Sequence, residues 1–189
     1  MIRAIIFDCF GVLYGGSYQA LQQLCPVDKL DELHDLNRQA DYGFITSDDY
    51  VRGAADLIGR PEDEVKGIFR AKHVRNDALM AYAASLRGKC KLALLSNVSN
   101  GIVEHLFSEE DLAIFDEVIL SYQEHITKPN PAVFTLAAER LGLHPEECVM
   151  VDDLAENCEG AEVVGMASIQ HTFNQLTTDI LSKMLHTEA

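Results

Sequence analysis

Acidic side chains follow two apolar segments of this chain. Asp8 directly follows the run at residues 5–7, and Asp152 and Asp153 directly follow the run at residues 148–151. A carboxylate at the carboxyl end of a buried strand lies where open α/β sheets place reactive groups. A single aspartate in that place can act as a nucleophile, whereas two adjacent carboxylates repel each other unless a positive charge lies nearby. Taken alone, an aspartate after a strand is more often a turn former or a helix cap, so the pattern marks Asp8, Asp152 and Asp153 as candidates without assigning them a role.

Three further polar residues stand at comparable positions. Ser96 and Asn97 follow the apolar run at residues 91–95, and Lys128 lies in the sequence TKPNP. Taken singly, serine and asparagine are common helix caps, and a lysine is usually a solvated surface charge. The two prolines restrict the backbone around Lys128 and favour a helix start at or after Pro131, which fixes where the lysine side chain emerges.

The four segments occur in the order of the four motifs of the haloacid dehalogenase superfamily, and the chain resembles that superfamily, in its phosphatase-like branch, over nearly its whole length. The resemblance is most specific from residue 128 to residue 165, where K-P-x-P, an apolar strand and DD-x-x-x-N follow one another. It implies that Asp8 is the nucleophile of a phosphoryl transfer and that Lys128 neutralises the nucleophile and the phosphate. It also implies that the Ser96 hydroxyl and the neighbouring amide of Asn97 hold the transferring phosphoryl group.

The same resemblance implies a Mg²⁺ cofactor. The three aspartates, when ionised against Lys128, leave an excess of about two negative charges, which repels an anionic substrate. A divalent cation bound through oxygen atoms removes that excess and bridges to a phosphate oxygen. The implied ligands are Asp8, the backbone carbonyl of Phe10, Asp152 and Asp153, with Asp153 expected to bind directly and Asp152 and Asn157 directly or through water.

Phe10 departs from the phosphatase form of the first motif, D-x-D-x-[TV], in which the second aspartate is the general acid and base. Its absence affects protonation of the leaving group and activation of water, a contribution typically worth ~10²- to 10⁴-fold in rate. We therefore expect a Mg²⁺-dependent phosphatase of a small phosphorylated metabolite that forms an aspartyl phosphate and favours good leaving groups, such as acyl phosphates or anomeric sugar phosphates.

Two alternatives remain open. The first is a 2-haloacid dehalogenase, because the L-2-haloacid dehalogenases of the superfamily carry an aromatic residue in the place of Phe10. Those enzymes use no metal and lack the acidic pair, so the chain takes one feature from each branch. The second is a catalytically silent binding or regulatory protein that has kept the fold and the metal site without the acid.

The later part of the chain predicts an α/β fold. Short apolar runs alternate there with helical segments, which is the signature of βα units and of a doubly wound, mainly parallel sheet with a Rossmann-like core. Residues 15–87 show helical periodicity and no convincing strand, with helix starts at Thr46 and Pro61. We expect a core of residues 1–14 and 88–189 and a small helical cap of residues 15–87 inserted after the first strand. Beyond that strand, further strands are expected at residues 91–95, 117–120, 148–151 and 167–170.

Composition narrows the function classes. The chain has 189 residues, of which 48% are hydrophobic, enough for one packed core with an accessory lobe. Its formal net charge of −15 repels nucleic acid and anionic membrane surfaces, so a small phosphorylated molecule is the expected partner. Five scattered cysteines, no secretory leader and no long apolar run predict a reduced, soluble, cytoplasmic protein. The spacings of cysteine phosphatases, P-loops and zinc sites are missing from the sequence.

Overall fold

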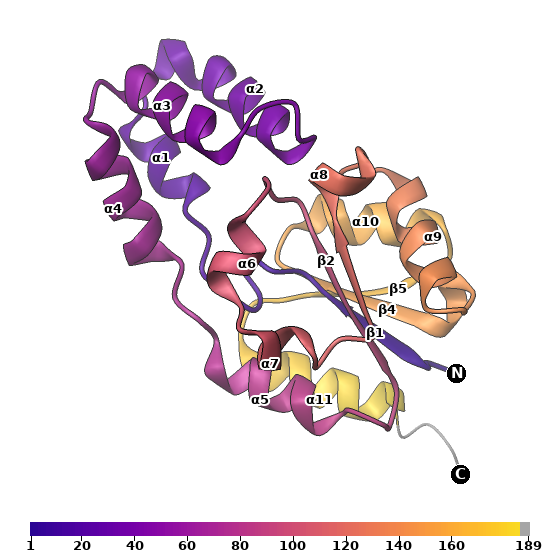
Figure 1. Cartoon of the computed structure of the whole chain (residues 1–189). Helices are drawn as coiled ribbons and strands as arrows, with labels where there is room; N and C mark the ends of the chain where they lie inside the picture. Colours follow the sequence, from indigo (N-terminus) through magenta and orange to yellow (C-terminus); the bar gives the residue numbers. More distant parts are fainter. Residues whose placement is uncertain (186–189) are drawn as a thin grey trace.

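Five parallel strands form the central sheet of this computed structural model, which describes residues 1–185. The strand order is β3-β2-β1-β4-β5, and each neighbouring pair is parallel. β1 lies in the middle, so the chain starts at the centre of the sheet and winds outward to both sides (Figure 1). This is the doubly wound α/β fold expected from the sequence. The strands are β1 (Ala4–Phe7), β2 (Lys91–Ser96), β3 (Glu117–Leu120), β4 (Cys148–Asp152) and β5 (Ala167–Gln170).

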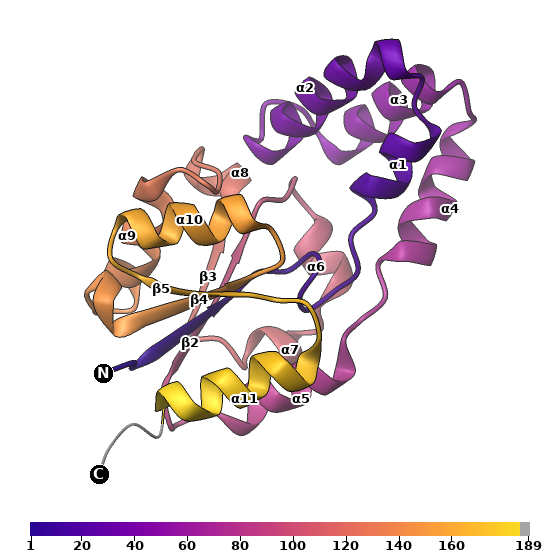
Figure 2. The same cartoon turned by 180° about the vertical axis from the view of Figure 1, so that it is seen from behind.

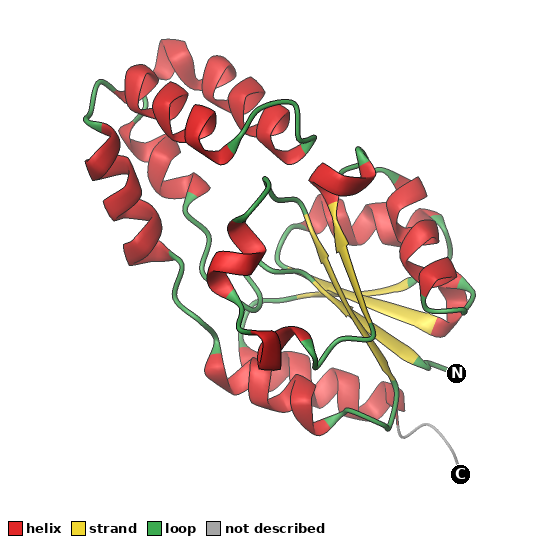
Figure 3. Ribbon diagram, viewed as in Figure 1, coloured by secondary structure: helices red, strands yellow, loops and turns green. Residues whose placement is uncertain are grey.

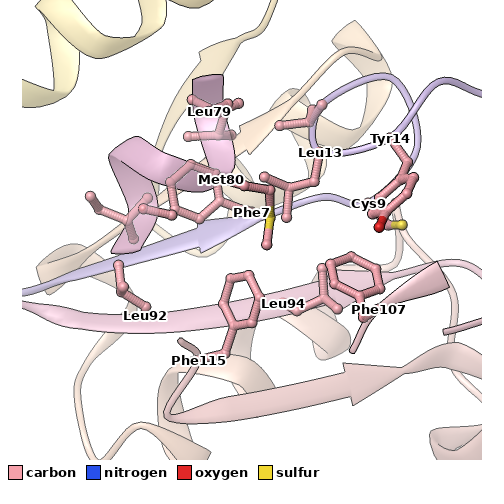
Figure 4. Packing of buried hydrophobic residues seen from close by; sticks show 14 of the residues in the cluster. Phe7, Cys9, Leu13, Tyr14, Leu79, Met80, Leu92, Leu94, Phe107 and Phe115 are labelled. Atoms are coloured by element: carbon pink, nitrogen blue, oxygen red, sulfur yellow. The ribbon is translucent and has the colours of Figure 1, made fainter. Parts of the chain in front are cut away.

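The inner strands are apolar because helices cover both faces of the sheet. Successive residues of β1 point to opposite faces, so Ile5 and Phe7 join one buried cluster while Ala4 and Ile6 join another. α5 and α11 cover the first face, where Figure 4 shows Phe7 beside side chains of α5, and α9 and α10 cover the second. The helices of the core are α5 (Asp77–Ser85), α6 (Ile102–Leu106), α7 (Glu109–Leu112), α8 (Ser121–Glu124), α9 (Pro131–Arg140), α10 (Ala155–Val163) and α11 (Asn174–Leu185).

Four helices form a cap with a buried apolar cluster of its own. Figures 1 and 2 show the cap on the side toward which the strands point, apart from the helices that cover the sheet. As expected, Thr46 and Asp49 form a capping box at the start of α3, and α4 begins directly after Pro61. None of the helices in residues 1–185 is long and apolar enough to cross a membrane. The cap helices are α1 (Tyr18–Leu24), α2 (Leu30–Asp41), α3 (Ser47–Ile58) and α4 (Glu62–Lys72).

Two linkers connect the cap to the core and run side by side, as the loop colouring of Figure 3 makes visible. The backbone N–H of Gly15 donates to the carbonyl of Val74 at 2.9 Å, and that of Asn76 donates to the carbonyl of Leu13 at 2.8 Å. A Cβ atom on Gly15 would lie 2.2 Å from the carbonyl oxygen of Lys72. The linkers therefore approach too closely at this point for any residue with a side chain.

α5 packs against the sheet, although the sequence pattern placed all of residues 15–87 in the cap. Leu79, Met80 and Ala83 of this helix lie in the same buried cluster as Phe7. Helical periodicity predicts that a segment forms a helix, but it does not specify which surface the apolar side of that helix covers. The segment that packs apart from the sheet ends with α4.

Candidate active site

Three carboxylates meet at the carboxyl ends of β1 and β4. These strands are neighbours with Phe7 opposite Val151, and the N–H of Asp8 donates to the carbonyl of Val151 at 2.9 Å. The register therefore brings Asp8 level with the end of β4, where Asp152 and Asp153 follow. One oxygen atom from each of the three carboxylates lies within 4.8 Å of the others.

The ammonium group of Lys128 joins two of these carboxylates. Its Nζ lies 2.7 Å from Oδ1 of Asp8 and 2.6 Å from Oδ2 of Asp152, and its side chain is almost fully buried. Burial opposes the charged form of Lys128, but the two carboxylates outweigh that effect and raise its pKa above the usual value. The lysine is therefore a permanent positive charge at the centre of the acidic group.

The pKa of Asp8 is shifted by its burial and by the charged groups around it. Burial raises the pKa of Asp8 to about 7, while the attraction of Lys128 lowers it and the charges of Asp152 and Asp153 raise it further. Burial, followed by the charge of Asp152, also raises the pKa of Asp153. One lysine thus compensates the site only in part, and a second cation would favour the ionised form of the carboxylates.

The backbone of Lys128 is held by the side chain of Asn97 at the end of β2. The Nδ2 atom of Asn97 donates to the carbonyl of Lys128 at 2.9 Å, and its Oδ1 accepts from the N–H of Lys128 at 2.8 Å. The next turn of the loop rests on α10, where a Cβ atom on Gly160 would lie 2.4 Å from the carbonyl oxygen of Pro129. The sequence suggested only that the backbone amide of Asn97 is used. No local pattern signals its side-chain contacts, because they join residues 31 positions apart.

Asp152 is held in place by hydrogen bonds to both carboxylate oxygen atoms. Its Oδ1 accepts from the N–H of Leu154 at 3.0 Å and from Nδ2 of Asn157 at 2.9 Å, while its Oδ2 accepts from Lys128. Asn157 was expected near the metal, and the structure places its amide nitrogen against Asp152. Asp152 thus orients Lys128 and is itself held in a fixed direction.

Asp153 packs against the turn that follows Asp8. Gly11 in that turn has φ +83°, and a Cβ atom there would lie 2.3 Å from the carboxylate carbon of Asp153. Only glycine combines this left-handed backbone with so close an approach. The turn at Gly11, in the first motif, therefore fixes the position of the Asp153 carboxylate in the fourth motif.

Ser96 and Phe10, the two remaining residues of the predicted site, lie in different surroundings. Ser96 ends β2 beside β1 and is fully buried. The ring of Phe10 packs on the ring of His73 in the second linker, with centroids 5.0 Å apart. Burial, with His105 adding to it, lowers the pKa of His73, whose Nε2 lies 3.1 Å from Oγ of Ser17. Phe10 therefore faces the cap linkers and provides no group that can exchange a proton.

The donor set fits a hard divalent cation. Carboxylate oxygen atoms at this spacing are the ligands that Mg²⁺ prefers, and the set contains no sulfur or imidazole atom that would favour zinc or copper. The three carboxylates carry more negative charge than Lys128 can balance, which favours binding of a divalent cation. The residues therefore suit Mg²⁺ in charge and in ligand type.

The chain is similar in sequence and in fold to several known proteins. The D-ribitol-5-phosphate phosphatase of Bacteroides thetaiotaomicron is 28% identical over 192 residues, covering 90% of this chain and 92% of that protein. A haloacid dehalogenase family enzyme of the same organism, crystallised with magnesium and inorganic phosphate, has the same fold with a TM-score of 0.70 and 22% identity, over 93% of this chain and 99% of its own.

A predicted haloacid dehalogenase-like hydrolase from Porphyromonas gingivalis matches over the whole of both chains, with a TM-score of 0.77 and 22% identity. At this identity the likeness establishes the shared fold. The family model described as haloacid dehalogenase-like hydrolase matches residues 2–165, a range that includes all four motifs and the cap. The chain therefore belongs to the haloacid dehalogenase-like hydrolases.

Proposed function

We propose that this chain hydrolyses phosphate monoesters of small metabolites with Mg²⁺ as its cofactor. The observation that carries the proposal is the convergence of three carboxylates around one buried lysine, Lys128. Such a site repels anions until a cation neutralises it, and Mg²⁺ prefers oxygen ligands. Two similar proteins support this proposal. One is a D-ribitol-5-phosphate phosphatase, and the other, which has the same fold, was crystallised with magnesium and inorganic phosphate.

Asp8 is the nucleophile in this proposal. Its Oδ1 accepts from the N–H of Cys9 and contacts Nζ of Lys128, both at 2.7 Å, so we assign the attack to Oδ2. Oδ2 forms a bond to phosphorus while the bond from phosphorus to the leaving-group oxygen breaks, which gives an aspartyl phosphate. Water then attacks phosphorus, and the bond to Asp8 breaks to release inorganic phosphate.

The other residues stabilise charge. The Ser96 hydroxyl and the backbone N–H of Asn97 hold phosphoryl oxygen atoms, and Lys128 balances the charge that builds up on them. Asp8, Asp153 and the backbone carbonyl of Phe10 would hold Mg²⁺. Asp152 would add a further carboxylate to the Mg²⁺ site, directly or through water, while it also holds Lys128. When bound, the ion neutralises the acidic group and polarises the phosphoryl group.

The test is phosphate release from a panel of sugar, polyol and acyl phosphates with Mg²⁺. We expect turnover that a chelator removes and that the Asp8→Asn variant loses down to background, because Asn cannot form the phosphoryl bond. Asp35→Asn is the matched control, since Asp35 lies exposed on the cap and pairs with Arg38 at the surface. Turnover by Asp8→Asn at the wild-type rate would exclude Asp8 as the nucleophile.

The two alternatives predict other results of the same experiment. A dehalogenase would release chloride from 2-chloropropionate without metal, using Asp8 to attack carbon. The acidic pair speaks against it, because a haloacid brings a further carboxylate to a site already rich in negative charge. A silent protein would turn over none of the substrates with or without Mg²⁺.

A further inference from the structure

The end of α2 is one of the parts of the cap that touch the loops around the proposed nucleophile, together with Ser47 at the start of α3. Ser121 at the end of β3 donates from Oγ to the carbonyl of Asp41 at 2.5 Å, and the same Oγ accepts from the N–H of Val98 at 2.9 Å. Val98 directly follows the Ser96-Asn97 segment. One hydroxyl therefore links the last residue of α2 to the loop that is proposed to hold the phosphoryl group.

Side chains inside the cap orient the carboxylate of Asp41. The Nδ2 atom of Asn37, one helical turn earlier, donates to Oδ2 of Asp41 at 2.8 Å. The hydroxyl of Tyr50 on α3 donates to Oδ1 of Asn37 at 3.0 Å, which fixes the amide with its nitrogen toward Asp41. The carboxylate thus has a defined direction at the boundary between the cap and the core.

The same tyrosine begins a row of rings that ends at Phe10. Tyr50 stacks on Phe69 with centroids 6.0 Å apart, and Phe69 stacks on His73 at 5.7 Å. His73 in turn packs on Phe10 at 5.0 Å. The residue that replaces the usual acid is therefore connected by a continuous row of contacts to the part of the cap that presents Asp41. One end of this row, Phe10, lies in the turn after Asp8, and the other end, Tyr50, holds Asn37 in the cap.

The charge environment of Asp41 suits proton exchange. Burial raises the pKa of Asp41 to about 7, and the charge of Lys128 acts in the opposite direction. The titratable groups that face it are Lys128 from the core loop, Tyr50 from α3 and Tyr18 from α1. Near neutral pH the carboxyl group therefore exists in both its acid and its base form, as a general acid–base catalyst requires.

We propose that Asp41 of the cap contacts the leaving-group oxygen and supplies the proton that Phe10 cannot supply. This inference rests on the proposed phosphatase function. As the bond from phosphorus to the leaving-group oxygen breaks, that oxygen takes the proton of the Asp41 carboxyl group and leaves as an alcohol. In the second half of the reaction the Asp41 carboxylate takes a proton from the attacking water, so that phosphate is released and the acid form returns.

The experiment compares Asp41→Asn with the wild type on two substrates, p-nitrophenyl phosphate and the alkyl phosphate that the wild type hydrolyses fastest. p-Nitrophenolate leaves without a proton, whereas an alkoxide does not. We expect Asp41→Asn to lower kcat on the alkyl phosphate by ~10²-fold or more. On p-nitrophenyl phosphate the variant should keep the initial burst of p-nitrophenolate and lose steady-state turnover, because only the water step still needs the base. Asp35→Asn on the exposed side of the same helix should behave as the wild type.

Rescue and titration give two independent readouts. Adding Phe10→Asp to Asp41→Asn should restore alkyl phosphate turnover, because it returns an acid to the usual place. The ionised form of Asp41 is unfavourable in the folded protein, so the Tm difference between Asp41→Asn and the wild type should grow in favour of the variant from about pH 5 to about pH 8. A constant Tm difference, or equal losses of burst and steady state on both substrates, would overturn the role of Asp41. A wild type without turnover on any ester would overturn the proposed function itself.

Discussion

At the scale of single residues, the charge balance of the site depends on Lys128. Its ammonium group is buried between Asp8 and Asp152 and compensates part of their combined charge. Removing one member of a buried ion pair leaves an uncompensated charge, which typically costs ~3–5 kcal/mol. The exposed pair of Lys66 and Glu62, 3.7 Å apart on α4, contributes far less, because solvent screens it.

We therefore predict that Lys128→Met destabilises the protein strongly at about pH 8 and less at about pH 5. The sign follows from Asp8, whose pKa lies at about 7 with the lysine present and rises when the lysine is removed. At the lower pH this carboxyl group holds a proton and no longer needs a partner, so the cost of the substitution falls. Urea unfolding of the two proteins at both pH values measures the difference. Lys66→Met is the control, and a loss that does not depend on pH would contradict the prediction.

At the scale of elements, the turn after β1 and the end of β4 must fit each other. Gly11 and Gly59 both have positive φ, so alanine costs backbone strain of ~1–2 kcal/mol at either position. A Cβ atom on Gly59 meets no atom within 4 Å, whereas one on Gly11 would overlap Asp153. Comparing alanine substitutions at these two glycines therefore distinguishes the effect of backbone strain from the effect of displacing the Asp153 carboxylate.

We predict that Gly11→Ala weakens Mg²⁺ binding by ~10-fold or more, as loss of ligand positioning commonly does, while Gly59→Ala leaves it unchanged. Both variants should lose similar stability from backbone strain. Titration calorimetry with MgCl₂ measures the affinity, and thermal unfolding measures the strain. If both variants bound Mg²⁺ as the wild type does, Asp153 would not be a ligand.

The sequence indicated the elements and the acidic group well, for a physical reason. Buried parallel strands are nearly continuous apolar runs, and polar residues directly after them must lie at one edge of the sheet. Asp8, Lys128 and Asp152 therefore meet as their positions suggested. Long-range contacts of ordinary helix residues produce no local sequence pattern that would predict them. The side-chain contacts of Asn97, the packing of α5 on the sheet and the position of Asp41 at the end of α2 depend on tertiary structure alone.

At the scale of the whole molecule, the charge of −15 destabilises the folded state by self-repulsion. Any salt screens part of that repulsion, but a bound cation acts in addition at its own site. We predict that MgCl₂ raises Tm more than NaCl of equal ionic strength, by the amount that binding to the folded state contributes. Thermal unfolding of the wild type and of Asp153→Asn checks this. The variant should show only the rise that both salts share, and an equal extra rise in the variant would place the ion elsewhere.

The row of rings from Tyr50 to Phe10 has an optical consequence. The chain contains no tryptophan, so its near-ultraviolet circular dichroism comes mainly from six tyrosines and eight phenylalanines. Rings held in fixed stacks give the strongest signals of this kind, and this row joins the cap to the turn after β1 across the linkers. A separation of the two lobes that parts His73 from Phe10 would break the row. The protein therefore has an intrinsic spectroscopic reporter of cap movement, and the phenylalanine in the place of the usual acid is one end of it.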